Sequence, residues 1–157
     1  MHRNVTAVVV AGRSIGISVE PRTFAESTRT AAEAAAAIGV ELGQIVKSLV
    51  FTVDDRPVLA LVSGDRQLAE TKLAAVAGGG RAARPDADLV RNVTGFPVGG
   101  VPPFGHTSDL PVYVDGGLLR YAEVWAAAGT PHVNFAVDPA RLVEATGGTV
   151  ADITRDR

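Results

Sequence analysis

The chain has 157 residues, of which 46% are hydrophobic and 20% charged, with a formal net charge of −2 at pH 7 and no cysteine. A chain of this length can bury one sizeable core, so we expect residues 1–157 to form a single domain. The lack of cysteine excludes disulfides, thiolate nucleophiles and cysteine-ligated zinc, and the acidic balance argues against a wide basic surface for DNA.

Signals for membranes, export and metals are missing from the sequence. No apolar run approaches the roughly 18 residues that span a bilayer, and the first residues lack the apolar stretch of a signal peptide. We therefore expect a cytoplasmic protein with no membrane partner. The three histidines, His2, His106 and His132, are too scattered for a metal site, so we expect neither a metal nor another cofactor.

The first predicted elements cover residues 4–19. Val5, Val8 and Ile15 fit one face of a helix that starts near Asn4, although so many valines suit a strand equally well. We assign a helix here. Residues 17–19 alternate between apolar and polar side chains before a proline, which predicts a short strand.

The next segment contains one helix and two strands. Thr30 and Glu33 have capping-box spacing before an alanine-rich run, and Gly39 can end the helix in the left-handed conformation. The pair Asp54-Asp55 separates two apolar runs and predicts the turn of a hairpin. The predicted elements are a helix at 30–38 and strands at 45–53 and 58–62.

A lysine interrupts the apolar face of the first of these strands. By the strand period of two, Lys47 shares its face with Ile45, Leu49, Phe51 and Val53. A buried ammonium costs several kcal/mol unless an anion or other acceptor meets it. Lys47 therefore either extends its charge to solvent from the strand end or points into a polar pocket that receives a ligand.

The second half of the chain mixes helices and strands without a regular βαβ alternation. Asp138 and Pro139 have the residue types of a helix start, and Gly147 those of a helix end. This order predicts an α+β domain built on a mixed sheet. The expected elements are helices at 65–77 and 86–94, strands near 112–114, 124–127 and 133–137, a turn at 129–131, a helix from 138 to 147 and a strand at 150–153.

A loop rich in glycine and proline follows the predicted helix that ends at Gly95. Residues 95–106 contain four glycines and three prolines, which exclude a continuous helix or a central strand. Glycines allow backbone N–H groups to approach a ligand, while prolines hold the loop in one shape. The loop is therefore either a rigid turn or a binding site.

The lysine-bearing strand and this loop together resemble the YbaK/prolyl-tRNA-synthetase-associated editing domain family. The resemblance runs from about Thr30 to Ile153. It implies a curved mixed sheet, or partly closed barrel, of about six or seven strands flanked by helices. The segments that carry it are 43–51, 94–106, 110–115, 123–129 and the closing helix.

The resemblance also assigns roles to individual residues. Lys47 matches the family's functional lysine, which meets a phosphate or ribose oxygen of the terminal adenosine. Gly99 and Pro103 match the Gly-x-x-x-Pro loop, whose backbone N–H groups hold the aminoacyl carbonyl as negative charge develops, with Gly100 as the main donor. Val101 and Pro102, between them, are expected to contact the substrate as well.

Four further positions complete the predicted site. Ser48 and Asp115 match polar pocket positions, and Asp115 could bind the substrate amine or orient water. Gly129 matches the glycine of a second loop beside the pocket. His132 follows that loop, where some members carry a histidine. We count Lys47, Gly100 and Asp115 as catalytic and the other residues as substrate-binding.

The activity implied by the resemblance is trans-editing, the metal-independent hydrolysis of the ester of mischarged aminoacyl-tRNA. Relatives act on small amino acids such as alanine or cysteine, commonly on the tRNA for proline. The expected partners are the acceptor end of the tRNA and an aminoacyl-tRNA synthetase. Two alternatives stay open: a binding module for an aminoacyl-adenosine that has lost turnover, and a hydrolase for an unrelated small ester. The sequence does not name the amino acid, the tRNA or the oligomeric state.

Overall fold

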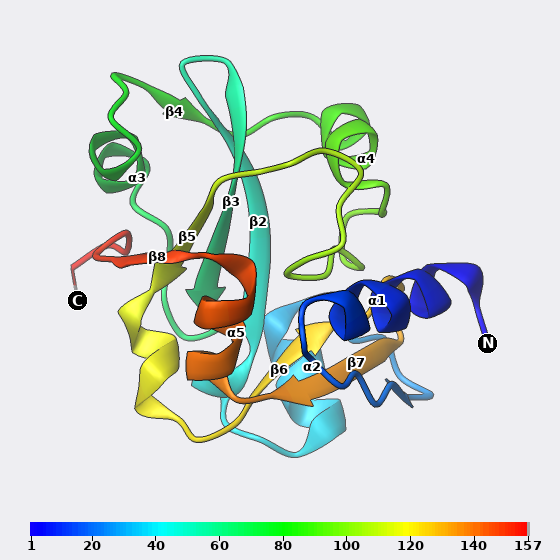
Figure 1. Cartoon of the computed structure of the whole chain (residues 1–157). Helices are drawn as coiled ribbons and strands as arrows, with labels where there is room; N and C mark the ends of the chain where they lie inside the picture. Colours follow the sequence, from blue (N-terminus) through cyan, green and yellow to red (C-terminus); the bar gives the residue numbers. More distant parts are fainter. Residues whose placement is uncertain (157) are drawn as a thin grey trace.

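Figure 1 shows a computed structural model that describes residues 1–156, with five α-helices, two short 3-10 helices and eight strands. The N- and C-termini lie on opposite sides of the molecule (Figure 1). The helices are α1 (Arg3–Ser14), α2 (Ala31–Ile38), α3 (Glu70–Val76), α4 (Ala87–Thr94) and α5 (Pro139–Thr146), with η1 (Leu42–Gln44) and η2 (Gly116–Arg120). The strands are β1 (Arg22–Thr23), β2 (Val46–Val53), β3 (Arg56–Ser63), β4 (Ala82–Ala83), β5 (Val112–Asp115), β6 (Val124–Ala127), β7 (Val133–Val137) and β8 (Thr149–Ala151).

The strands form a mixed sheet and a smaller antiparallel sheet. The mixed sheet has the order β4-β2-β3-β5-β8, and the smaller one the order β1-β7-β6. Strands β3, β5 and β8 run parallel to one another, whereas β2 is antiparallel to both β3 and β4. An isolated bridge between Ile45 and Trp125 joins the two sheets. The prediction of an α+β fold with a mixed sheet is confirmed.

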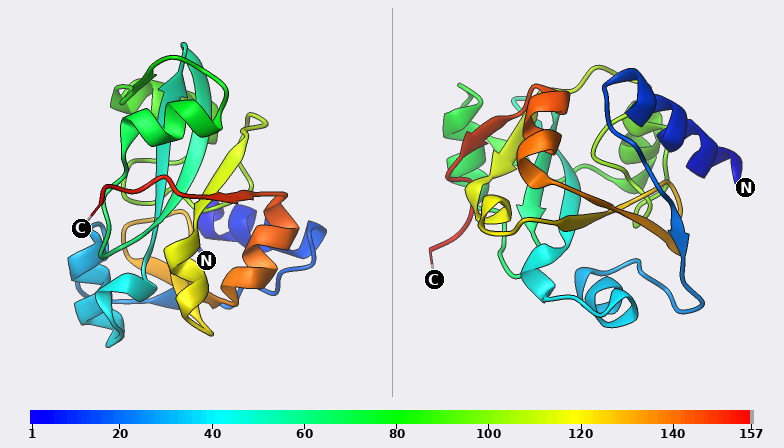
Figure 2. Two further views of the ribbon diagram at one scale, coloured as in Figure 1. Left: turned by 90° about the vertical axis from the view of Figure 1, so that its left-hand side faces the viewer. Right: turned by 60° about the horizontal axis from the view of Figure 1, so that its bottom comes forward.

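The β2–β3 hairpin is the longest strand pair, with its register running from Val46 opposite Ser63 to Val53 opposite Arg56. Asp54 and Asp55 form its turn with φ of 48° and 67°. Both angles are positive, as a two-residue type I′ turn requires. Figure 2 shows this hairpin rising above the rest of the molecule.

The predicted helices at 30–38 and 86–94 and the helix after Asp138 are confirmed, and their caps explain their bounds. The hydroxyl of Thr30 accepts from the Glu33 N–H, and Gly39 has φ of +85°. Asp86 and Asp138 accept hydrogen bonds at the starts of α4 and α5. The N-terminal segment is also helical, but its cap is His2 rather than Asn4.

Two predicted elements were wrong. Residues 17–19 form no strand; Ile17 donates back to Gly12 and packs into the core, and the strand forms later, at β1. The predicted helix at 65–77 begins only at Glu70. The preceding residues run beside the C-terminal segment, where Leu68 bridges Thr154 and the Ala69 N–H donates to Ile153. The last strand, predicted at 150–153, is β8 and ends at Ala151.

Strand β2 separates two parts of the hydrophobic core. Val46 and Val50 belong to the larger cluster, which also contains Phe135. Phe51 and Val53 belong to a second cluster on the other face of the strand. The alternation predicted for this strand is therefore present. Within residues 1–156 no helix has the length and apolar character needed to cross a membrane.

Candidate active site

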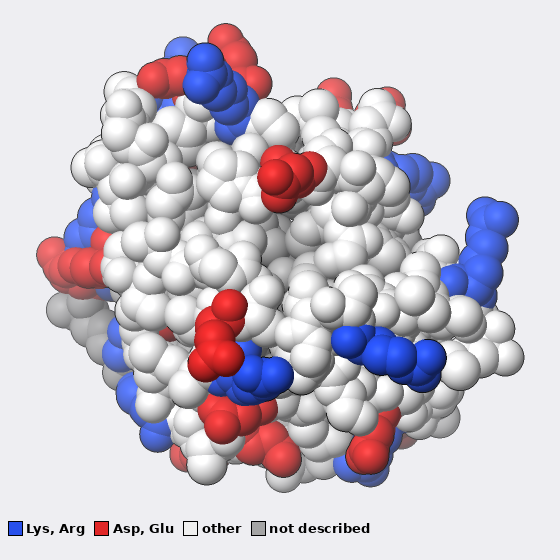
Figure 3. Space-filling view, in the orientation of Figure 1, with Lys and Arg blue, Asp and Glu red and all other residues white. Residues whose placement is uncertain are grey.

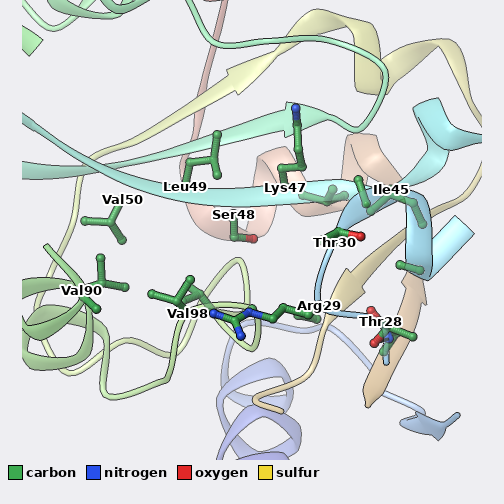
Figure 4. A pocket seen from close by; sticks show the side chains of 18 of the residues that line it. Thr28, Arg29, Thr30, Ile45, Lys47, Ser48, Leu49, Val50, Val90 and Val98 are labelled. Carbon is green, nitrogen blue, oxygen red and sulfur yellow. Dashed lines mark hydrogen bonds between the residues drawn. The ribbon is translucent and has the colours of Figure 1, made fainter. Parts of the chain in front are cut away.

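A cavity of about 500 Å³ lies beside strand β2. The strand residues from Ile45 to Phe51 line one side of it. The rest of the lining comes from residues 28–31 and 34, residues 84–90 up to and into α4, the tip of the glycine-proline loop, and Ala127 and Asn134 of β6 and β7. Figure 4 shows Val98 and Arg29 facing β2 across this space. A cavity of this size lies within the range of small-molecule binding sites.

The glycine-proline loop is held in one shape by its own contacts. The Thr94 hydroxyl accepts from the Phe96 N–H at 3.1 Å and donates to the Val90 carbonyl. His106 donates from Nε2 to the carbonyl oxygen of Pro102 at 2.7 Å, and burial lowers the pKa of that histidine. These contacts hold the loop as a preformed wall of the cavity.

Hydrophobic side chains anchor the same loop to the core. Phe96, Val101 and Phe104 are buried, and the ring of Phe104 packs edge-on against Phe135 with 5.7 Å between centroids. Pro102 and Pro103 are buried as well. These two prolines do not line the cavity and support the loop from behind.

The backbone amides at the tip of the glycine-proline loop differ in whether they already donate a hydrogen bond within the loop. The Gly100 N–H donates to the Pro97 carbonyl at 2.9 Å, so this amide is engaged inside the loop. Gly99, with φ of +89°, and Val101 line the cavity. Their N–H groups have no backbone partner in the part of the chain that the structure describes. Gly99 and Val101 are therefore the better-placed donors for a substrate oxygen.

Gly100 is close to the second glycine loop. A Cβ added to Gly100 would lie 2.9 Å from both the carbonyl carbon and oxygen of Gly129. The side-chain amide of Asn4 donates to the same Gly129 carbonyl at 3.1 Å. Both glycines are buried, and Gly129 is outside the cavity lining. Gly129 thus contributes by letting the loop tip pack against it.

Ser48 lies on the cavity side of β2. Figure 4 shows the side chains of Ser48 and Val50 directed toward Val98, with Lys47 and Leu49 on the other side of the strand. The Ser48 hydroxyl is buried and has no hydrogen-bond partner within residues 1–156. A buried hydroxyl without a partner is costly, so this position is suited to a bound polar group.

A second polar group faces the cavity from β7. The amide Nδ2 of Asn134 donates to the Thr28 hydroxyl at 2.6 Å, and that hydroxyl donates to the Pro131 carbonyl at 2.7 Å. Because a carbonyl only accepts, the hydroxyl proton is committed to Pro131 and the hydroxyl must accept from Asn134. These two hydrogen bonds fix the orientation of the Asn134 amide and leave its Oδ1 atom as an acceptor at the cavity wall.

Lys47 lies on the part of β2 that lines the cavity, but its ammonium points to the other face of the strand. The Nζ atom donates to the carbonyl oxygen of Arg66. Burial lowers the pKa of Lys47 below its ordinary value of 10.5, while the nearby carboxylates of Asp115 and Asp65 act against this shift. Arg84 lowers the pKa further. The lysine thus carries its charge in a half-buried position between the cavity and a polar cluster.

Asp115 is the buried centre of that polar cluster. Its carboxylate accepts from the Gly117 N–H at 2.8 Å and from the Ser63 N–H at 3.1 Å. Arg66 approaches the same carboxylate at 3.4 Å. Asp115 does not line the cavity. The structure therefore places this residue behind Lys47, where its charge acts on the lysine rather than on a molecule in the cavity.

The predicted site residues thus fall into three groups. Ser48, Gly99, Val101 and Lys47 line the cavity. The second group supports the loop or lies behind Lys47, and its members are Gly100, Pro102, Pro103, Gly129 and Asp115. His132 is exposed and outside the cavity lining, with its Nδ1 atom 3.2 Å from the Glu26 carbonyl oxygen.

Two arginines at the cavity were not predicted as site residues. Arg29 and Arg84 line it and are exposed, and the Arg84 guanidinium lies over the Phe51 ring at 5.6 Å from its centroid. Neither forms a salt bridge in residues 1–156. Figure 3 shows that, on the face of the molecule drawn there, the basic side chains are scattered rather than gathered into one patch.

Thr28 and Asn134 were also missed. No spacing in the sequence connects them, because they are 106 residues apart and meet only when β7 packs beside the segment that leads to α2. An asparagine inside an otherwise apolar strand, Val133-Asn134-Phe135, was the one available signal.

Comparison with known protein families gives a match over most of the chain. The family model described as the aminoacyl-tRNA editing domain matches residues 25–145. A solved structure described as a "putative trans-editing enzyme for prolyl tRNA synthetase" is 43% identical, with a TM-score of 0.93 and 99% of each chain covered.

Two curated relatives show the same similarity. A "putative Cys-tRNA(Pro)/Cys-tRNA(Cys) deacylase", EbsC of Enterococcus faecalis, is 29% identical over 83% of this chain and 80% of its own length. A proline–tRNA ligase of Maridesulfovibrio salexigens is 39% identical over 61% of this chain. The matched part spans only 17% of that ligase, so the similarity concerns one segment of the larger enzyme.

Proposed function

The chain belongs to the aminoacyl-tRNA editing domain family, and from this premise we propose that it is a deacylase that hydrolyses, in trans, the ester bond of a mischarged aminoacyl-tRNA. The observation that carries the proposal is the arrangement of groups around the cavity. Within residues 1–156, the N–H groups of Gly99 and Val101, which have no backbone partner, lie on one wall, and the acceptor Asn134 and the unpartnered hydroxyl of Ser48 lie on the others.

The loop amides supply the electrostatic part of the reaction. Attack on the ester carbonyl develops negative charge on its oxygen, and preorganised N–H donors stabilise that charge without reorganisation during the step. Gly99 and Val101 provide such donors on a loop that is anchored at both ends. The nucleophile is water, assisted by the ribose hydroxyl of the substrate itself, or the thiol of the substrate when cysteine is attached.

Lys47 supplies the positive charge. We assign its ammonium to a phosphate or ribose oxygen of the terminal adenosine, which the long lysine stem reaches by leaving the Arg66 carbonyl. The lysine is half-buried, so its charge is screened less than that of a surface lysine. Asp115 positions this lysine and tunes its pKa from the face of β2 that lies away from the cavity.

Asn134 accounts for recognition of the aminoacyl group. Its Oδ1 atom, oriented through Thr28, is an acceptor suited to an α-ammonium group. Ala127, which pairs with Asn134 in the β6–β7 register, also lines the cavity, and this small apolar neighbour suits a small side chain. We therefore propose a small amino acid such as alanine or cysteine as the edited group, with the tRNA for proline as its carrier.

A synthetase is proposed as a second partner. The chain has a net charge of −2, and on the face drawn in Figure 3 its basic side chains are scattered. Because affinity for nucleic acid depends on phosphate neutralisation by lysine and arginine, such a surface contacts only the acceptor end of the tRNA. A prolyl-tRNA synthetase would supply the remaining affinity by holding the tRNA.

Deacylation of a panel of mischarged tRNAs tests the proposal. The panel contains alanyl- and cysteinyl-tRNA for proline and several small amino acids on other tRNAs, each incubated with wild type and with Lys47→Ala. We expect rapid, lysine-dependent hydrolysis of one or two of these esters. A folded protein that turns over none of them would instead support the binding module.

A further inference from the structure

The floor of the cavity is a strand edge without a neighbouring strand. On one side, β2 pairs with β3 along its whole length. On the other side, β4 pairs only with Thr52 and Val53, and β6 meets the strand only at the Ile45–Trp125 bridge. Ser48 and Val50 therefore have no strand partner on this edge within residues 1–156.

The hydrogen-bond pattern shows which backbone groups this edge presents. The Asp54 N–H donates to Arg81 on the β4 side, and backbone groups alternate between the two edges of a strand. Residues with even numbers, Ser48 and Val50 among them, thus direct their N–H and C=O groups toward the cavity. Their odd-numbered neighbours pair with β3.

Val50 is only 6% exposed, so its edge-facing backbone groups are shielded from solvent. Ser48 is half-buried, and its buried hydroxyl has no hydrogen-bond partner within residues 1–156. More than nine in ten buried backbone groups in folded proteins are hydrogen-bonded. Two independent observations, an unpaired strand edge and an unpaired hydroxyl, therefore indicate that a polar ligand binds along this edge.

The edge is too short for a peptide strand. Sheet extension by a peptide needs an open edge along which the added strand can continue. Here β4 occupies the same edge from Thr52 onward, and β6 occupies it at Ile45. The open part covers only residues 46–51, so the ligand must be compact.

We propose that the Ser48 carbonyl and the Val50 N–H bind the adenine base of the 3′-terminal adenosine through its N6 amino group and N1 atom. This inference rests on the proposed deacylase function, which makes the terminal adenosine the nucleoside next to the ester. On the edge of β2, the Ser48 carbonyl is an acceptor and the Val50 N–H is a donor. On the adenine ring, the N6 amino group is a donor and the adjacent N1 atom is an acceptor, so the two pairs match. An α-ammonium group has only donors and an ester carbonyl only an acceptor, so neither satisfies both backbone groups.

The surroundings of the edge suit a flat aromatic ring. The apolar side chains of Val90, Val98 and Val101 line the space in front of it, and Figure 4 shows Val90 and Val98 opposite Val50. Arg84 lies at the same cavity with no carboxylate partner in the described chain. The ring would pack against the valines with its edge on β2.

The first experiment changes the substrate, so that no variant can fail by unfolding. An acceptor-stem minihelix carrying the same mischarged ester is prepared with a 3′-terminal adenosine, purine riboside, 1-deazaadenosine or 7-deazaadenosine. Purine riboside lacks the N6 amino group and 1-deazaadenosine lacks N1, so each should lower kcat/KM by about 2- to 12-fold, the range for one neutral hydrogen bond. The 7-deazaadenosine substrate keeps both atoms and should react like adenosine.

The second experiment observes the protein directly. In ¹⁵N-labelled protein titrated with adenosine, the Val50 amide resonance should shift, whereas that of Leu49, which pairs with β3, should shift less. 1-Deazaadenosine serves as the control because it cannot accept from Val50. Equal kcat/KM for all four minihelices together with an unmoved Val50 amide would overturn the proposal. A shifted Val50 amide in a protein that hydrolyses no ester would contradict the deacylase function and leave the base contact standing.

Discussion

Removing the charge of Lys47 while keeping its stem is the most direct test of how the cavity works. In Lys47→Met the side chain still packs on β2, but the ammonium that contacts the Arg66 carbonyl is gone. At an effective dielectric constant of about 20, two unit charges about 4 Å apart interact by about 4 kcal/mol. Solvent screening at a half-buried position reduces this to about 2–3 kcal/mol, which corresponds to a loss of about 30- to 150-fold in kcat/KM.

The expected effect on stability is small, and this separates catalysis from folding. The variant loses one hydrogen bond to a carbonyl, but it also removes the cost of burying an ammonium. We expect the free energy of unfolding to change by about 1 kcal/mol or less. Urea unfolding followed by circular dichroism measures this change on the same preparation used for kinetics.

The assay is hydrolysis of the best ester from the panel, measured as kcat/KM, with Lys72→Met as the matched control. Lys72 lies on α3 and bonds Asp152 and Asp156 near the C-terminus, away from the cavity. The control should retain wild-type kcat/KM. If Lys47→Met is as active as wild type, the lysine has no role in the reaction and the proposed charge contact is refuted.

A pH profile and three further variants test the lysine and the rest of the site. Burial lowers the pKa of Lys47 below 10.5, so activity that needs the ammonium should fall as pH rises through a value below 10.5. Asp115→Asn removes the carboxylate that opposes this shift, so the alkaline limb of its pH–kcat/KM profile should move to lower pH; an unmoved limb would contradict the coupling. Gly100→Ala places a Cβ 2.9 Å from the backbone of the facing loop and should cost about 1–3 kcal/mol in urea unfolding, whereas in the control Gly80→Ala the nearest atom is 3.7 Å away and the cost should be under 1 kcal/mol. Ser48→Ala removes a buried hydroxyl with no partner, so stability should stay equal or rise while kcat/KM falls several-fold; unchanged kcat/KM would show that the hydroxyl does not meet the substrate.

Much of the fold could be predicted because its element ends are determined by local chemistry. Thr30 and Asp86 accept hydrogen bonds from the first turns of their helices, and Gly39 and Gly95 end those helices with positive φ. Such contacts span a few residues and need no knowledge of the rest of the chain.

The errors occurred where a distant segment decides the conformation. Residues 65–69 have a helix-compatible pattern, but their backbone pairs with the C-terminal segment through the Ala69–Ile153 hydrogen bond. The strand at β4 forms only because Thr52 and Val53 present an edge to it. Neither partner can be identified from the local sequence, since tertiary pairing overrides propensity at these positions.

In the site too, local sequence predicts one part and the tertiary structure decides the other, as the neighbours Lys47 and Ser48 show. A period of two places Lys47 and Ser48 on opposite faces of a strand, and the structure confirms this alternation. The family resemblance places both residues in one site, which would be contradictory for a strand in the middle of a sheet. At Ser48 and Val50, however, β2 has an open edge, and a cavity at an open edge borders both faces. In the proposed function, Ser48 meets the substrate from its face directly, and Lys47 reaches it around the edge with a four-carbon stem. On this argument, shortening the stem should be nearly as damaging as removing the charge, because a shorter cation could not pass the edge.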